Sequence, residues 1–207
     1  MFLRKLILSI FLLSFFTNES FSAEKQEKLL TQAWSFNGFF GKFDRASLQR
    51  GYQVYAEVCA SCHSMNLLSY RNLSEVGGPG FSEEEVKAIA SKVEVLDGPN
   101  DSGEMFKRPG KPSDKFASPF TNEKAARAAN GGAYPPDMSV LVKARAGGAD
   151  YIYSVLMGYE DKPPKNIKLE DGVYYNKYMS GNKIKMAKPL NKDSVNYFKR
   201  IGGAGKK

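Results

Sequence analysis

The chain has 207 residues, of which 42% are hydrophobic and 25% are charged, and its formal net charge is +8. These proportions are those of an ordinary globular protein, and the length suits a single domain. The chain contains only two Cys and one His, which is too few for the four Cys or His ligands that a structural zinc site needs.

Residues 1–23 have the features of a secretory signal peptide. Arg4 and Lys5 give a positive start, residues 6–16 are an apolar run, and small residues allow cleavage after Ser22 or Ala23. The apolar run is too short for a membrane-spanning helix, although an uncleaved anchor is the alternative. We therefore expect residues 24–207 to be exported to the bacterial periplasm or an equivalent compartment.

The first helix is predicted to follow Asp44, a favourable N-cap residue. One face carries residues at helical spacing: Leu48, Tyr52, Tyr55 and Cys59. Gly51 interrupts this helix, and such a Gly often marks the close approach of a second helix.

At the end of this helix the chain reads Cys59-Ala60-Ser61-Cys62-His63, a C-x-x-C-H motif. In this motif two thiols can each add to a vinyl group of a haem, and the adjacent imidazole can ligate its iron. The motif contains every Cys and His in the chain. A disulfide or a thioredoxin-like redox pair is the alternative, but a redox pair expects a βαβ context, whereas the flanks here have a helical pattern. The motif therefore favours one covalently bound haem c.

The remaining elements are also mostly helical. Ser82 and Glu85 form a capping box before a helix that reaches Val93, and further helices are predicted at 122–130 and 150–157. Residues 97–120 are predicted to be loop, and 173–175 are the only strand-like stretch. The expected fold class is therefore mainly α, a single cytochrome c-type haem domain with long loops.

Because no second His exists, a Met is the natural ligand opposite His63, and a His/Met pair raises the reduction potential of a haem. Met65 is too close to His63 in sequence to reach the opposite face. Met186 lies in a late loop that could close over the open haem face, and we rank Met179 and Met105 behind it. Met138 and Met157 are expected in the core, as is usual for Met.

An ordered set of motifs resembles the cytochrome c1 family over residues 34–190. The markers are Trp34-Ser35-Phe36-Asn37-Gly38, Gln49–Tyr55, Val58–Ser64, Asp97–Asn100, Gly103–Phe106, Arg108–Gly110, Pro135–Ser139, Lys143–Gly148, Tyr151–Ser154 and Gly158–Asp161. This ordered set of motifs is far more specific than C-x-x-C-H alone, which many cytochromes share.

The resemblance implies roles for eight residues at matching positions. Cys59 and Cys62 would hold the haem, and His63 and Met186 would be the metal ligands. Three further residues would line the haem: Asn130, Pro135 and Pro136. Arg145 would face a propionate, which a guanidinium can bind through two hydrogen bonds.

The implied function is one-electron transfer within the quinol–cytochrome c reductase (cytochrome bc1) complex. The subunit would pass electrons from the Rieske iron–sulfur protein to a soluble cytochrome c, beside cytochrome b, at the periplasmic face of the inner membrane. It would not be a catalyst alone, because the cofactor does the chemistry. The alternatives are a soluble periplasmic c-type carrier, a haem peroxidase, which needs an open iron site, and a thiol oxidoreductase.

The chain also departs from the family pattern. Met179 and Ser180 replace an aromatic residue and a proline, and Lys183, Lys185 and Lys188 surround the expected axial Met. Beyond Leu190 the family continues into a helix that crosses the first helix and then into a membrane anchor, whereas residues 191–207 contain no apolar stretch of about 20 residues. This difference predicts a truncated or frame-shifted form with part of the first helix uncovered.

Charge is unevenly distributed, with a net +8 in residues 165–207 and about −1 in residues 24–164. The exported location argues against nucleic acid as a partner and favours an anionic membrane surface near the tail. Two acidic clusters could steer a basic partner. They are Glu83–Glu85 and the group formed by Asp97, Asp101 and Glu104.

Overall fold

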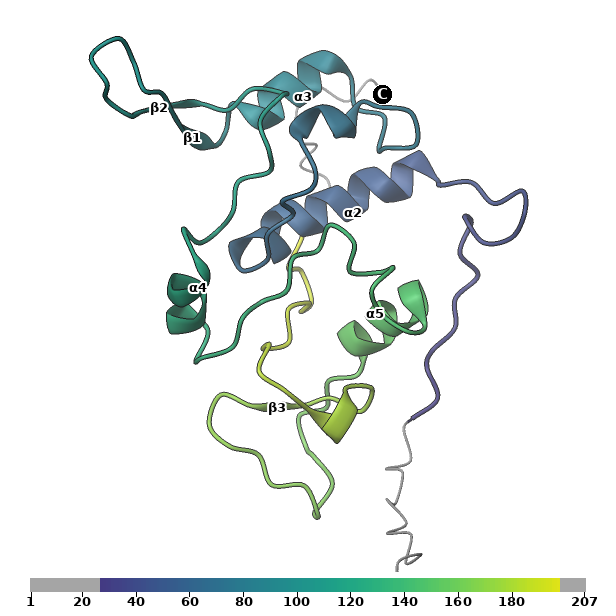
Figure 1. The fold of residues 1–207 in the computed structure, drawn as a ribbon. Coiled ribbons are helices and arrows are strands. Elements are labelled where there is room, and N and C mark those ends of the chain that lie inside the picture. The colour runs from purple at the N-terminus through teal and green to yellow at the C-terminus, as the bar shows by residue number, and fades with distance from the viewer. Residues whose placement is uncertain (1–26, 198–207) are drawn as a thin grey trace, which may run out of the picture.

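The computed structural model describes residues 27–197 (Figure 1). The predicted signal peptide at residues 1–23 and the final stretch at 198–207 lie outside the described residues.

The described part of the chain is mainly helical, with long connections, which confirms the expected fold class. The α-helices are α2 (Arg45–Glu57), α3 (Glu83–Ala90), α4 (Glu123–Ala129) and α5 (Gly148–Met157). Short 3-10 helices are η2 (Cys59–Ser61), η3 (Tyr70–Leu73) and η4 (Ser180–Asn182). Each predicted α-helix is present. Helix α5 begins two residues earlier than its sequence pattern indicated, and α3 ends at Ala90 rather than at Val93.

Helix starts follow the predicted capping. The Asp44 side chain accepts a hydrogen bond from the Ser47 amide at 3.1 Å, which satisfies one free donor at the start of α2. At α3, the Ser82 hydroxyl accepts from the Glu85 amide at 3.2 Å and the Glu85 carboxylate accepts from the Ser82 amide at 2.9 Å. The capping box is therefore confirmed, and both helices start where local hydrogen bonding allows.

The prediction that 97–120 is entirely loop is wrong. An antiparallel hairpin pairs β1 (Glu94–Asp97) with β2 (Phe106–Pro109), in a register that places Asp97 opposite Phe106. Arg108 binds Asp97 and also donates to Asp114 at 2.7 Å. Each strand has only four residues and depends on pairing with its partner, so neither gives a clear periodic signal alone.

A second small ladder, β3 (Tyr174–Tyr175) with β4 (Lys183–Ile184), pairs Tyr174 with Ile184. It includes two residues of the strand-like stretch expected at 173–175. The segment that contains Met186 follows β4 directly.

The core lies where α2 meets η3 and α3. It is built from buried aromatic and aliphatic residues: Tyr55, Tyr70, Leu73, Phe81, Val86, Ile89, Ala90 and Phe116. Tyr70 and Phe116 have ring centroids 4.6 Å apart. Cys59, Met65 and Met138 pack against this cluster, so the core itself fixes the position of the C-x-x-C-H motif.

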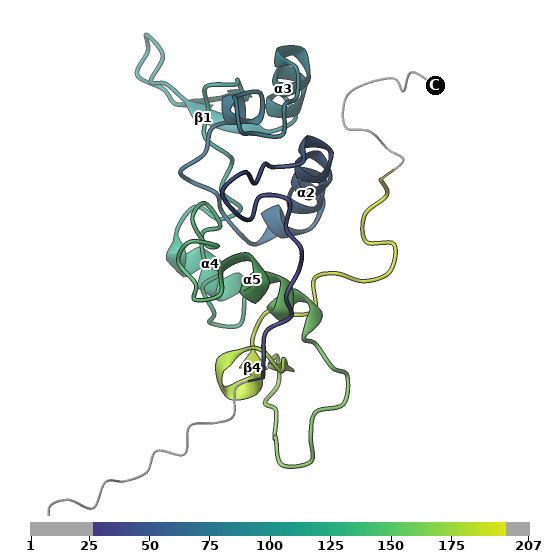
Figure 2. The ribbon, with the colours of Figure 1, turned by 90° about the vertical axis from the view of Figure 1, so that its right-hand side faces the viewer.

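Figures 1 and 2 show α2, α3 and the β1–β2 hairpin in one half of the molecule, with α4, α5 and β3 in the other. After β4 the chain returns toward α2, and the Gln53 side chain donates to the Asn196 carbonyl at 3.0 Å. The long loops therefore link the two halves.

Gly51 lies on an uncovered part of α2 in the described part of the chain, whereas Tyr55 on the same helix is buried in the core. Among the described residues, nothing lies within 4 Å of a Cβ placed at this position, and Gly51 itself is exposed. Gly51 faces solvent, so the expected close helix crossing is not seen there. Within residues 27–197 no helix has the length and apolarity needed to cross a membrane.

Candidate haem site

The two predicted attachment cysteines lie directly after α2. The 3-10 turn η2 begins at Cys59, and the amides of Cys62 and His63 both donate to the Cys59 carbonyl, at 3.1 and 2.9 Å. Both thiols are free and half-buried. Burial raises the pKa of the Cys59 thiol, and the nearby Cys62 adds to this effect. The tight turn keeps Cys59, Cys62 and His63 in one compact group.

A hydrogen bond orients the His63 ring. Its Nδ1 atom lies 2.8 Å from the carbonyl oxygen of Pro136. A carbonyl can only accept, so Nδ1 carries the proton and Nε2 keeps its lone pair for a metal. Such a second contact fixes both the tautomer and the ring orientation of a ligating His. The structure thus brings two predicted site residues, His63 and Pro136, into contact.

Asp137 fastens the His63 loop to the Pro135–Ser139 segment, a role that sequence reasoning did not identify. Its carboxylate accepts from the Ser64 hydroxyl at 2.7 Å and from the Asn66 amide at 2.8 Å. It also accepts from the Ser139 amide at 2.8 Å. Partial burial alone would raise the pKa of Asp137, but these hydrogen bonds to the charged form outweigh it and lower the pKa to about 2. In the sequence, the only sign of this role was that Asp137 lies within Pro135–Ser139, one of the motifs that carry the family resemblance.

The half-buried Met186 lies in a bend after β4, and two contacts hold this bend. The Tyr159 hydroxyl donates to the Met186 carbonyl at 2.9 Å. The Lys185 ammonium donates to the Gly131 carbonyl at 2.8 Å. Burial raises the pKa of Tyr159 to about 12, so its hydroxyl stays a donor at neutral pH. Neither Tyr159 nor Lys185 was singled out as a site residue from the sequence.

Asn130 lies at the C-terminal end of α4, where its side-chain amide donates to the Ala126 carbonyl at 2.7 Å. It is adjacent to Gly131, the residue that Lys185 contacts. Segment 130–139 therefore reaches the Met186 bend at one end and the His63 loop at the other. This arrangement brings Asn130, Pro136 and both predicted ligands into one connected region.

The other methionines occupy different settings. Met105 is 54% exposed at the β1–β2 hairpin, and Met157 is 55% exposed at the end of α5, so the expectation that Met157 is core is wrong. Met138 packs against the core as expected. The Met179 sulfur is 3.4 Å from the Tyr151 hydroxyl.

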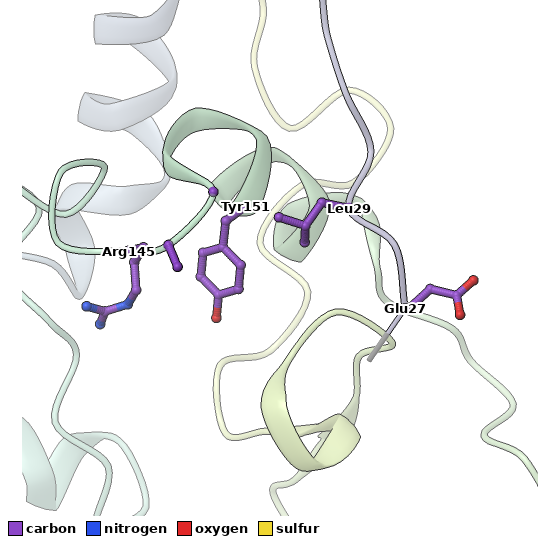
Figure 3. Close-up of a pocket in the computed structure, with 6 residues that line it drawn as sticks. Glu27, Leu29, Arg145 and Tyr151 are labelled. Atoms are coloured by element: carbon purple, nitrogen blue, oxygen red, sulfur yellow. The ribbon is translucent and has the colours of Figure 1, made fainter. Parts of the chain in front are cut away.

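Arg145 lines a hollow of about 430 Å³ beside the start of α5 (Figure 3). Figure 3 shows the Arg145 side chain and the Tyr151 ring extending from the same stretch of backbone, while the Glu27 side chain points away from them. Arg145 is the only predicted site residue in this lining, which also includes Leu29 and Gly147. The Arg145 guanidinium and the Tyr151 hydroxyl line the same hollow, and both can donate hydrogen bonds to a carboxylate group.

The residues present fit a covalently bound haem. Two free thiols flank a tight turn, and the adjacent imidazole has its Nε2 available for iron. In residues 27–197 there is no cluster of three or more His, Cys, Asp or Glu that could hold a bare metal ion. Two thiols and one imidazole are the groups that haem attachment through a C-x-x-C-H motif uses.

Comparisons with known proteins extend over most of the chain. The model of the Cytochrome C1 family matches residues 34–200. "Cytochrome b/c1" of Bradyrhizobium diazoefficiens is 50% identical over 192 residues, covering 84% of this chain and 28% of that protein. "Cytochrome c1 1, heme protein, mitochondrial" of Arabidopsis thaliana is 54% identical over 164 residues, covering 79% of this chain and 52% of that protein. "Cytochrome c1" of Rhodospirillum rubrum is 46% identical over 181 residues, covering 80% of this chain and 65% of that protein. The chain thus spans between about a quarter and two thirds of the length of these three relatives.

Proposed function

The chain belongs to the cytochrome c1 family, and from this premise we propose that it is the haem-bearing electron-transfer subunit of a cytochrome bc1 complex. When bound, the haem supplies a one-electron couple at its iron. The polypeptide makes or breaks no substrate bond, so the subunit is not an enzyme alone.

Each site residue has a distinct task in this proposal. Cys59 and Cys62 hold one haem c by thioether bonds, and His63 and Met186 ligate its iron. Pro136 keeps the His63 Nε2 atom available through its contact with Nδ1.

The other three predicted site residues lie around the haem in this proposal. Asn130 and Pro135 line the haem, and Arg145 faces a propionate. Tyr151 shares the hollow with Arg145 and adds a hydroxyl donor on the same side.

The partners and location are also part of the proposal. Electrons come from the Rieske iron–sulfur subunit and leave to a cytochrome c, with cytochrome b as the neighbouring membrane subunit. The names of two relatives support a complex of this kind: "Cytochrome b/c1" and the "Cytochrome b-c1 complex catalytic subunit, mitochondrial" of Candida albicans. Cleavage after Ser22 or Ala23 would release the chain at the periplasmic face of the inner membrane, which the N-terminal mass of the exported protein tests.

The single observation that carries the proposal is the His63 contact to Pro136 next to two free, half-buried thiols. It prepares one side of an iron site and two attachment points at once. The test is to express the full chain with a haem-maturation system, denature it, and stain for covalent haem. The matched controls are Cys59→Ser and Cys62→Ser, each of which removes one thioether, and a variant with both changes.

We expect one haem per chain, retained after denaturation and lost in the double variant. The reduced haem protein should then pass electrons to a soluble cytochrome c, and the oxidised form should accept them from a Rieske protein. A chain without covalent haem, or a haem protein that exchanges electrons with neither partner, contradicts the proposal.

A further inference from the structure

The polypeptide around Met186 has little regular structure to hold it. The β3–β4 ladder ends at Ile184, Lys185 and Met186 form a bend, and residues 187–190 have no regular backbone pattern. An axial ligand must be kept within about 0.5 Å of its working position. Side chains outside the β3–β4 ladder must therefore hold Met186 in place.

Two hydrogen bonds to different segments of the chain supply such a constraint, and we refer to them together as the Met186 clasp. In one, the Tyr159 hydroxyl donates to the Met186 carbonyl at 2.9 Å. In the other, the Lys185 ammonium donates to the Gly131 carbonyl at 2.8 Å. The first links the bend to the end of α5, and the second links it to the turn after α4.

Backbone and side-chain contacts hold Tyr159, the first donor of the clasp, in place. Tyr159 forms a β-bridge with Asn176, a residue with no exposed surface. The Asn176 side chain donates to the Val155 carbonyl of α5 at 2.7 Å, and the Lys177 amide donates to the Gly158 carbonyl at 3.1 Å. Because these contacts fix Tyr159 and the backbone that leads into it, its hydroxyl is held in place as a donor.

The Lys185 side is more exposed, but its acceptor is also fixed. The Gly132 amide donates to the Arg127 carbonyl at 2.8 Å, and the Asn130 side chain closes the end of α4. Lys183 and Lys188 are both exposed. Of the three lysines that surround Met186, Lys185 is the one whose ammonium reaches the α4 turn.

We infer that Tyr159 and Lys185 are positioning residues that hold Met186 as an iron ligand, acting through its backbone rather than touching the iron. This inference rests on the proposed function, because it requires a haem ligated by Met186. The clasp would raise the free energy needed to swing Met186 away, so other ligands would compete with it less well.

The test uses the full chain matured with its haem and imidazole as a competing ligand. The oxidised protein is titrated with imidazole while its sulfur–iron charge-transfer band is followed. Tyr159→Phe removes only the hydroxyl, with Tyr174→Phe as its matched control. Lys185→Gln removes the ammonium, with Lys188→Gln as a control of equal charge change and Lys185→Arg as a rescue.

A net hydrogen bond of ordinary strength corresponds to a change of about three- to tenfold in such an equilibrium. We expect Tyr159→Phe to tighten apparent imidazole binding by about this factor. Lys185→Gln, at a more exposed site, should tighten it about two- to threefold, and Lys185→Arg should restore most of the difference. The two control variants should match the unmodified protein.

The possible failures are distinguishable. If the unmodified haem protein shows no sulfur–iron band, Met186 ligation is wrong and the clasp falls with it. If the band is present but Tyr159→Phe and Lys185→Gln titrate like their controls, the clasp is overturned while the proposed function stands. Thermal melts followed by circular dichroism identify any variant whose effect comes from general unfolding.

Discussion

At His63 one hydrogen bond decides which ring nitrogen can act. The Pro136 carbonyl accepts a hydrogen bond from the Nδ1–H group, so in the neutral ring Nε2 keeps its lone pair. Pro136 offers this carbonyl from a segment that Asp137 fixes against the His63 loop. Neighbouring residues thus fix the orientation of the ring that is the predicted iron ligand.

The Met186 assignment gives the most direct prediction at this scale. Met186→Ala should abolish the sulfur–iron charge-transfer band and lower the reduction potential, because a His/Met pair favours a high potential. Met179→Ala is the matched control and should retain the band. A band that survives Met186→Ala but is lost in Met179→Ala would show that the ligand was wrongly assigned. Optical titration against redox mediators measures both quantities.

Asp137 predicts a specific dependence of stability on pH. Its folded-state pKa of about 2 lies below the usual value near 3.9. Its charged form therefore contributes stability that is fully present above about pH 4 and is lost as the pH falls toward 2. The contribution is on the order of 1–2 kcal/mol after allowance for partial exposure.

The measurement compares Asp137→Asn with the unmodified protein by denaturant unfolding between pH 2.5 and 7. The difference in unfolding free energy should be constant at pH 5–7 and shrink below pH 4. Asp101→Asn, at an exposed position, is the control. A difference that does not change between pH 2.5 and 7 rules out the carboxylate as its source.

At the scale of elements, the buried face of α3 and the end of α2 define where the haem motif lies. Val86 is 1% exposed and Ala90 has no exposed surface, and Cys59 packs against the same cluster. Burying apolar side chains of this kind contributes roughly 1.5–3 kcal/mol for each large one. Anything that weakens α3 should therefore loosen the support of the motif.

The capping box at the start of α3 makes this testable. Ser82→Ala removes the acceptor of the Glu85 amide and should reduce the unfolding free energy by about 1 kcal/mol. Ser82→Thr keeps a hydroxyl at this position and should retain most of the stability. Equal losses in both variants, measured by denaturant unfolding, would show that the hydroxyl contact is not the cause.

At the scale of the whole molecule, charge separates along the chain, with the net positive charge in residues 165–207. In the structure, some carboxylates of the two predicted acidic clusters are already engaged in contacts within the chain. Glu85 is engaged in the capping box and Asp97 is paired with Arg108. Glu83 and Glu84 remain exposed in the first turn of α3, and Asp101 and Glu104 remain exposed between β1 and β2, so each cluster keeps a pair of carboxylates that can meet a basic partner.

Electron transfer to a basic cytochrome c should therefore slow several-fold as ionic strength rises from 0.01 to 0.15 M, because the screening length falls from about 30 to about 8 Å. A variant with Glu83→Gln and Glu84→Gln should show a weaker salt dependence. Glu170→Gln with Asp171→Asn, in the exposed loop before β3, is the control of equal charge change. Stopped-flow rates that do not respond to salt, or that respond alike in both variants, would remove this role.

Local interactions explain what was predictable from the sequence. The caps at Asp44 and Ser82 act over three residues, and the C-x-x-C-H motif lies within five consecutive residues. Such features depend on neighbours in the chain, so the helices and the fold class could be predicted, and the motif itself marks the predicted attachment point. The β1–β2 hairpin could not, because its short strands exist only through pairing with each other.

Only the tertiary structure decided how the ligands are held. The partners of the His63–Pro136 contact are 73 residues apart, those of Lys185 and Gly131 are 54 apart, and those of Tyr159 and Met186 are 27 apart. Neither hydrophobic periodicity nor a helix cap in the sequence indicates contacts between residues so far apart. These contacts depend on how the long loops close around the core. The sequence by itself therefore determined which residues are candidates to bind a haem, whereas only the folded chain shows which distant residues contact them.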